Sequence, residues 1–117
     1  MSFKFEKLEV WELATQYSDH IYDLADKLPR REEGTLRMQI IRAATSIALN
    51  IAEGSTTQSN AEQARFLGMA IRSLIETVAC LDLIQRRNYC GSLLIDQTRE
   101  QAEKLFAKLQ AFRNSLR

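Results

Sequence analysis

The sequence is poor in residues that make turns, catalytic sites and metal sites. Its 117 residues include one proline, four glycines, two cysteines and one histidine. So few turn-forming residues favour a handful of long helices over many short strands. No segment has the roughly 20 apolar residues of a membrane-spanning helix, and the first residues lack the apolar run of a signal peptide. We therefore expect an all-α cytoplasmic protein without a membrane anchor.

The scarcity of histidine bears on chemistry as well. His20 is the only histidine, and Tyr17 stands where a Glu-x-x-His metal motif requires glutamate. Ser-His-Asp and Cys-His catalysis are disfavoured for the same reason, and the glycines are too far apart for a phosphate-binding loop. We expect no metal, no cofactor and no enzymatic activity, with His20 at the surface and Cys80 and Cys90 as reduced thiols.

Composition and charge are those of an ordinary globular domain. Hydrophobic residues make up 45% of the chain, charged residues 26%, and the formal net charge is +1. This length and composition predict one folded domain over residues 1–117. A net charge so close to zero gives no global attraction to nucleic acid, so an anionic partner would need a local basic patch.

Four amphipathic segments follow one another along the chain. Their apolar residues recur in steps of three and four, which predicts helices at about 7–28, 36–53, 60–87 and 92–116. Short connections between long helices predict an up-down antiparallel four-helix bundle. The expected inward residues are Val10, Ala14, Tyr17, Ile21, Leu24 and Leu28 in the first helix, Leu36, Ile40, Ala43, Ala44, Ile47 and Ile51 in the second, Ala64, Leu67, Ile71, Leu74, Val78, Leu81 and Gln85 in the third, and Ile95, Thr98, Ala102, Leu105, Leu109, Phe112 and Leu116 in the fourth.

Several residues mark the expected helix ends. Gly54 is placed to end the second helix in the left-handed conformation. A polar turn over residues 55–58 follows, and Ser59 and Glu62 then have the spacing of a capping box. Ser92 is the expected cap of the last helix.

The second and third helices carry apolar or small residues on a second side. These residues are Met38, Ile41 and Leu49 in the second helix and Phe66, Met69, Ser73, Cys80 and Ile84 in the third. A lone bundle would leave part of this surface exposed, so we expect copies of the chain to meet side by side as a homo-oligomer.

A line of polar residues follows the second helix as well. It consists of Gln39, Arg42, Ser46, Asn50 and Glu53. One interpretation is structural, with these groups hydrogen-bonding across helices or across a subunit boundary to set their register. The other is a polar groove that binds phosphate or another protein, extended by nearby arginines such as Arg37, Arg65 and Arg72. On the third helix, Arg72 and Glu76 are spaced to form an ion pair.

The most distinctive stretch runs from Gln39 to Gly54 and ends in Asn-Ile-Ala-Glu-Gly. It resembles the central motif of the four-helix-bundle proteins named after intervening sequences in bacterial 23S ribosomal RNA genes. Matches elsewhere cover nearly the whole chain, namely Leu8-x-Val10-Trp11, Leu28-Pro29, Ser59-x-x-Glu62 and Phe66-Leu67-x-x-Ala70-x-x-Ser73-Leu74-x-Glu76.

The resemblance implies two further properties. Members of the family look like symmetric rings, typically pentamers. They also resemble an accessory protein of diversity-generating retroelements that binds nucleic acid and a reverse transcriptase. This sequence departs from the pattern at the second turn, where basic residues are common and Thr57, Gln58, Asn60 and Ala61 stand here. The expected basic patch is thinner as a result.

Two hypotheses for function follow from these observations. In the leading one, a non-catalytic, ring-forming bundle engages the backbone of RNA or DNA through Arg37, Arg42, Arg65 and Arg72. In the other, the protein is a protein-interaction scaffold whose polar line holds subunits together, and no nucleic acid binds.

Overall fold

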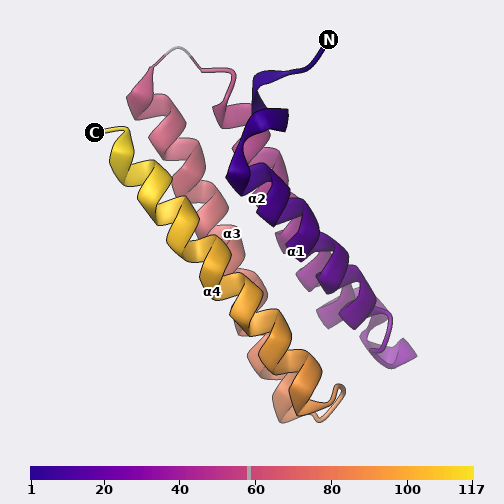
Figure 1. The fold of residues 1–117 in the computed structure, drawn as a ribbon. Coiled ribbons are helices and arrows are strands. Elements are labelled where there is room, and N and C mark those ends of the chain that lie inside the picture. Colours follow the sequence, from indigo (N-terminus) through magenta and orange to yellow (C-terminus); the bar gives the residue numbers. More distant parts are fainter. Residues whose placement is uncertain (58) are drawn as a thin grey trace.

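Four helices run antiparallel to one another along most of the chain. A computed structural model describes residues 1–57 and 59–117, with α1 at Glu9–Ala25, α2 at Met38–Gly54, α3 at Asn60–Arg86 and α4 at Ser92–Ser115. The helices lie side by side in an elongated body of 44 × 24 × 22 Å, with both chain ends at the same end (Figure 1). α1 packs against α2 and α4, and α3 packs against the same two helices. The predicted antiparallel four-helix bundle is confirmed.

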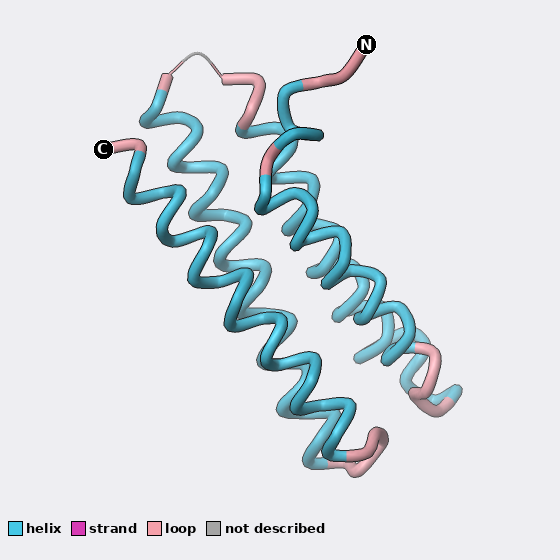
Figure 2. The backbone as a smooth tube through the Cα atoms, in the orientation of Figure 1, coloured by secondary structure: helices cyan, strands magenta, loops and turns pink. Residues whose placement is uncertain are grey.

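Helices and short connections account for all the described residues (Figure 2). No helix within residues 1–57 and 59–117 combines the length and hydrophobicity of a membrane span. The predicted turn over residues 55–58 includes Gln58, which lies outside the described residues.

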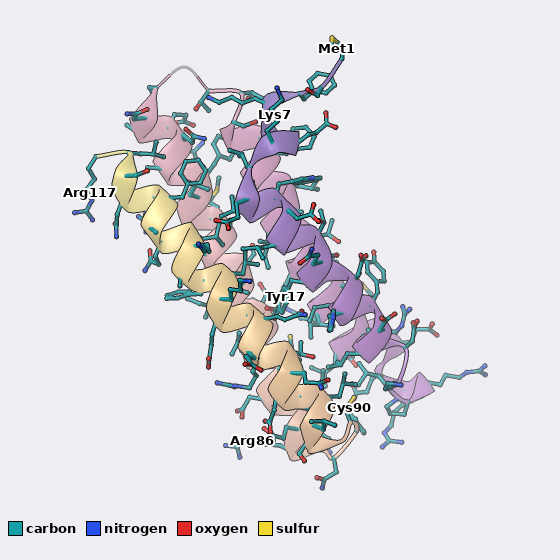
Figure 3. The ribbon with its side chains drawn as sticks, in the orientation of Figure 1. Met1, Lys7, Tyr17, Arg86, Cys90 and Arg117 are labelled. Atoms are coloured by element: carbon teal, nitrogen blue, oxygen red, sulfur yellow. The ribbon has the colours of Figure 1, made fainter. Side chains whose placement is uncertain are left out.

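The inward residues of the four helices form one continuous core. The seams predicted for α1, α2 and α4 are buried or half-buried along their whole length. Tyr17 lies between the helices (Figure 3), where its hydroxyl is 2.8 Å from the Thr77 hydroxyl. Thr77 in turn donates to the carbonyl oxygen of Leu74 at 2.6 Å. Both polar groups are therefore satisfied inside an otherwise apolar interior.

The first helix is shorter than predicted at both ends. A separate 3-10 turn occupies Lys4–Lys7, and α1 ends at Ala25 rather than at residue 28. After Ala25 the backbone closes into tighter turns, in which the amide of Lys27 bonds to Leu24 and that of Leu28 to Ala25. The ring of Pro29 restricts Leu28 to extended geometry, so the helix is already unwinding before it. Leu28 remains buried although it lies outside the helix.

Both ends of α2 differ from the prediction. A π-helical turn at Glu33–Arg37 comes first, and regular α-helix starts at Met38. Gly54 is the last helical residue and is not left-handed, because the only positive φ among the described residues belongs to Asn88. A Cβ at Gly54 would lie 2.8 Å from Phe66 Cβ. Gly54 is therefore required for the close approach of α3 to α2. The predicted left-handed conformation of Gly54 was wrong.

The two remaining caps agree with the sequence in part. The Ser59 hydroxyl accepts from the Glu62 amide at 3.1 Å, as a capping box requires. The Glu62 carboxylate does not reach back, because it accepts from the Arg65 guanidinium instead. Ser92 is the first residue of α4 and makes no cap bond; Gly91 holds the cap position.

The predicted faces of α3 need correction. Gln85 was expected to face inward but is exposed near the helix end. Cys80 and Ile84, which were placed on a second face, are buried in the core of this same bundle. The cause is that α3 packs against both α2 and α4, so its buried arc is wider than one seam. Part of the second apolar line is thus covered without any second copy.

His20 is also less exposed than expected. It is half-buried, and its Nε2 lies 3.1 Å from Nε2 of Gln101, so the pair bridges α1 and α4. Among residues 1–57 and 59–117, the buried Gln101 Oε1 has no hydrogen-bond partner.

Candidate functional site

The polar line of α2 lies at the boundary between α2 and α3. Asn50 Nδ2 donates to the carbonyl oxygen of Ser46 at 2.9 Å and to its hydroxyl at 3.1 Å. The same Ser46 hydroxyl accepts from Ser73 of α3 at 2.9 Å. The Ser73–Ser46 bond connects α3 to α2, whereas the two Asn50 bonds lie within α2.

Further along the same boundary, Gln39 connects α2 to α3. Its amide donates to the Glu76 carboxylate at 2.8 Å, so Glu76 bonds Gln39 rather than the predicted partner Arg72. Arg42 is exposed, and its hydrogen-bond contact is with the sulfur of Met38 at 3.8 Å. A recess of about 510 Å³ opens here between the helices. Glu53 is exposed at the far end of the line, beside a second shallow recess on α2.

The four arginines of the nucleic-acid hypothesis lie in three different places. Arg37 pairs with Asp26 at 3.0 Å, next to the end of α1. Arg42 lines the recess between α2 and α3. Arg65 and Arg72 are seven residues apart on α3, which puts both on one side of that helix. Of the predicted set, the single chain brings only Arg65 and Arg72 together.

Arg113 of α4 joins this pair, so that three guanidinium groups line one recess of about 380 Å³. We call the recess lined by Arg65, Gly68, Met69, Ile71, Arg72 and Arg113 the arginine cleft. A Cβ at Gly68 would lie 3.5 Å from the Cζ and Nη2 atoms of Arg113, so the guanidinium rests against the bare backbone of α3. Gly68 lies between Arg65 and Arg72 along the helix, and the three arginines line the same recess.

The charges of the arginine cleft are unequally matched. Arg65 pairs with Glu62, and this contact lowers the pKa of the Glu62 carboxyl and raises that of the arginine. Arg65 also lies over the Phe66 ring, with 4.8 Å between its Cζ and the ring centroid. Within residues 1–57 and 59–117, Arg72 and Arg113 have no carboxylate within 4 Å. The cleft thus holds three positive groups against one paired negative group.

Sequence reasoning found Arg65 and Arg72 but missed Arg113. The only signal for Arg113 is its position near the end of the last helix. In an antiparallel pair, that end lies beside the start of α3.

In the part of the chain that the structure describes, no group of three His, Cys, Asp or Glu residues is close enough to hold a metal ion.

The model of the 23S rRNA-intervening sequence protein family matches residues 6–111. The chain belongs to this family. The predicted resemblance is thereby confirmed, and the intervening-sequence protein described here has the four-helix fold throughout the matched residues that the structure describes.

A solved relative has the same architecture. The fold of the chain is similar to that in the crystal structure of a protein with unknown function from the S23 ribosomal protein family of Bacteroides thetaiotaomicron VPI-5482. The two share 24% identity over 90% of this chain and 95% of the other, with a TM-score of 0.82. At this identity the similarity shows the fold alone. No curated protein matches the chain.

Proposed function

We propose that this intervening-sequence protein is a non-catalytic RNA- or DNA-binding protein whose arginine cleft holds backbone phosphates. The observation that carries the proposal is that Arg65, Arg72 and Arg113 line one recess at Gly68, where Glu62 is the one carboxylate paired with them among the described residues. Guanidinium groups bind phosphate in a planar, bidentate way, so three of them around one recess suit a polyanion.

Electrostatics favours an anion at this position. Three nearby cations repel one another, and a phosphate placed among them replaces that repulsion by attraction. The net charge of the whole chain is only +1, so binding would depend on this local excess rather than on a global field. Phosphate contacts carry no sequence information, and the expected binding is therefore largely independent of base sequence.

Assembly would multiply the effect of one cleft. The family resemblance implies a ring, typically a pentamer, in which the arginine cleft would recur on every copy. Several weak phosphate sites acting on one strand bind more tightly than any single site. Met38 and Leu49 are 42% and 53% exposed on α2, and they offer an apolar surface on which copies would meet.

Fluorescence anisotropy with a labelled RNA strand and a labelled DNA duplex tests the proposal. We expect binding that weakens as salt rises, and a marked loss of affinity when Arg72→Gln and Arg113→Gln are combined. Arg86→Gln is the control, because Arg86 is an exposed α3 arginine near the opposite end of the bundle from Arg117 (Figure 3). Equal affinities for the control and the double variant, or no binding to either probe by the native protein, would refute the proposal.

The second candidate function is a protein-interaction scaffold without nucleic acid. Two observations favour it: Arg37 and Arg65 are already paired with carboxylates, and α2 exposes Met38 and Leu49. In this case Arg42, which lies on the same side of α2, would help to hold subunits together. Arg42→Ala should then lower the mass of the assembly in light scattering, and an unchanged mass would remove Arg42 from any subunit contact.

A further inference from the structure

The surface groove between α3 and α4, which we call the outer seam, contains the arginine cleft and a further recess. On α4, Arg99, Phe106 and Arg113 are spaced seven residues apart, and on α3 Gly68 and Ile75 have the same spacing. Seven residues are nearly two helical turns, so each set recurs on one face of its helix. Arg113 rests on Gly68, and Phe106 and Ile75 line one recess further along the seam.

The recess that Phe106 and Ile75 line is apolar and open to solvent. It has a volume of about 240 Å³ and is lined by Leu74, Ile75, Val78, Arg99, Ala102, Glu103 and Phe106. Ile75 is 54% exposed and Phe106 37% exposed, so an aromatic ring and a branched side chain both face outward. Arg72 of the arginine cleft and Ile75 of this recess are three residues apart, which makes them neighbours on the α3 surface.

Two arginines of α4 precede and follow Phe106 on the same face of the helix. Along the axis of α4, the Cα atoms of Arg99 and Arg113 are each about 10 Å from that of Phe106, because the helix rises about 1.5 Å per residue over seven residues. A chain of phosphates following the seam would meet a guanidinium before and after the ring. Glu103 at the recess edge is the opposing charge, and its carboxylate is an acceptor suited to the amino group of a base.

Resting on the proposed function, we propose that the ligand of this seam is single-stranded nucleic acid. Backbone phosphates, one to each guanidinium, occupy the arginine cleft, and an unstacked base lies against the ring of Phe106. Proteins that bind single strands combine a basic groove with aromatic side chains on which bases stack. The bases of a duplex are already stacked on one another and are not free to contact Phe106.

The test measures how the Phe106 ring contributes to binding of a short labelled single strand by the full-length protein. Phe106→Leu keeps the side chain apolar but removes the aromatic face, and Phe106→Trp keeps an aromatic face. We expect Phe106→Leu to weaken binding about 5- to 150-fold with an unchanged salt dependence, and Phe106→Trp to bind like the native protein. Leu93→Ala is the control, since Leu93 is an exposed apolar residue of α4 outside both recesses.

Two further probes separate the possible failures. A strand with abasic sites should bind the native protein weakly and should not distinguish it from Phe106→Leu. If Phe106→Leu binds the intact strand as well as the native protein while the Arg72 and Arg113 variants do not, the base contact is refuted and the phosphate site stands. Tighter binding to a duplex than to the single strand also refutes the inference. No binding to any probe refutes the proposed function itself.

Discussion

Replacing Gly54 by alanine tests whether α2 and α3 pack this closely only because residue 54 has no side chain. The added Cβ would lie 2.8 Å from Phe66 Cβ and 3.5 Å from Phe66 Cγ. Carbon atoms prefer separations of about 3.5–4.0 Å, so the closer contact is too short by at least about 0.7 Å. Both Cβ atoms are fixed to backbone, and rotation of the Phe66 ring gives no relief. The helices must therefore move apart at this end.

The expected loss follows from two opposing terms. Overpacking of this kind costs about 1–3 kcal/mol, while alanine in place of glycine gains up to about 1 kcal/mol in helix propensity. Because neither Cβ can move aside, we take the upper part of the overpacking range, about 2–3 kcal/mol, and a propensity gain of about 1 kcal/mol, so Gly54→Ala should lower the free energy of unfolding by about 1–2 kcal/mol.

Urea denaturation followed by circular dichroism, at one fixed protein concentration, measures this change. Gly34→Ala is the control, since a Cβ at Gly34 would meet nothing within 4 Å, and it should not destabilise the protein. Gly54→Asn separates the steric cause from a left-handed cap, because asparagine tolerates left-handed geometry but also carries a Cβ. A Gly54→Ala protein as stable as the native one, or rescue by Gly54→Asn, would refute the steric explanation.

Three other predictions concern stability. Ile47→Ala should lower the free energy of unfolding by about 2–5 kcal/mol in urea melts, because Ile47 is fully buried; a loss near zero would mean that the inner face of α2 is misassigned. Burial raises the pKa of Tyr17 to about 12, so its contribution to stability is complete below pH 10 and is lost as pH rises toward 12. Absorbance titration of tyrosinate should lose its highest step in Tyr17→Phe, and retention of that step would contradict this. Hydrogen bonds from Thr35 and Tyr89 lower the pKa of the Glu32 carboxyl, so its contribution is complete above the ordinary pKa and is lost as pH falls through the lowered one. Glu32→Gln should therefore make stability in acid less dependent on pH, and an unchanged acid profile would rule this out.

The helices and their inner faces could be predicted because burial repeats with the period of the helix. Tyr17, Ile47 and Leu105 all lie where the steps of three and four place them, and each is at most 1% exposed. The predictions failed where the outcome depends on which helix lies next to which. Cys80 and Ile84 are buried because α3 has two neighbours in its own bundle, and this is a property of packing rather than of periodicity.

The same difference between helical periodicity and helix packing explains which residues of the arginine cleft could be predicted. Arg65 and Arg72 could be paired from their spacing on one helix. Their third partner comes from the far end of the last helix and is placed by contact with Gly68, which has no side chain to suggest it. The separation of Arg37 and Arg42 from this pair likewise depends on the relative positions of whole helices.

The most direct test of the account is the salt dependence of single-strand binding. Each phosphate contact contributes about 0.7 to the slope of log affinity against log salt concentration, so three guanidinium contacts predict a slope near −2. The combined Arg72→Gln and Arg113→Gln protein should retain about a third of that slope. A native slope near zero, or an equal slope in the native and double-variant proteins, would contradict the claim that the arginine cleft binds phosphates.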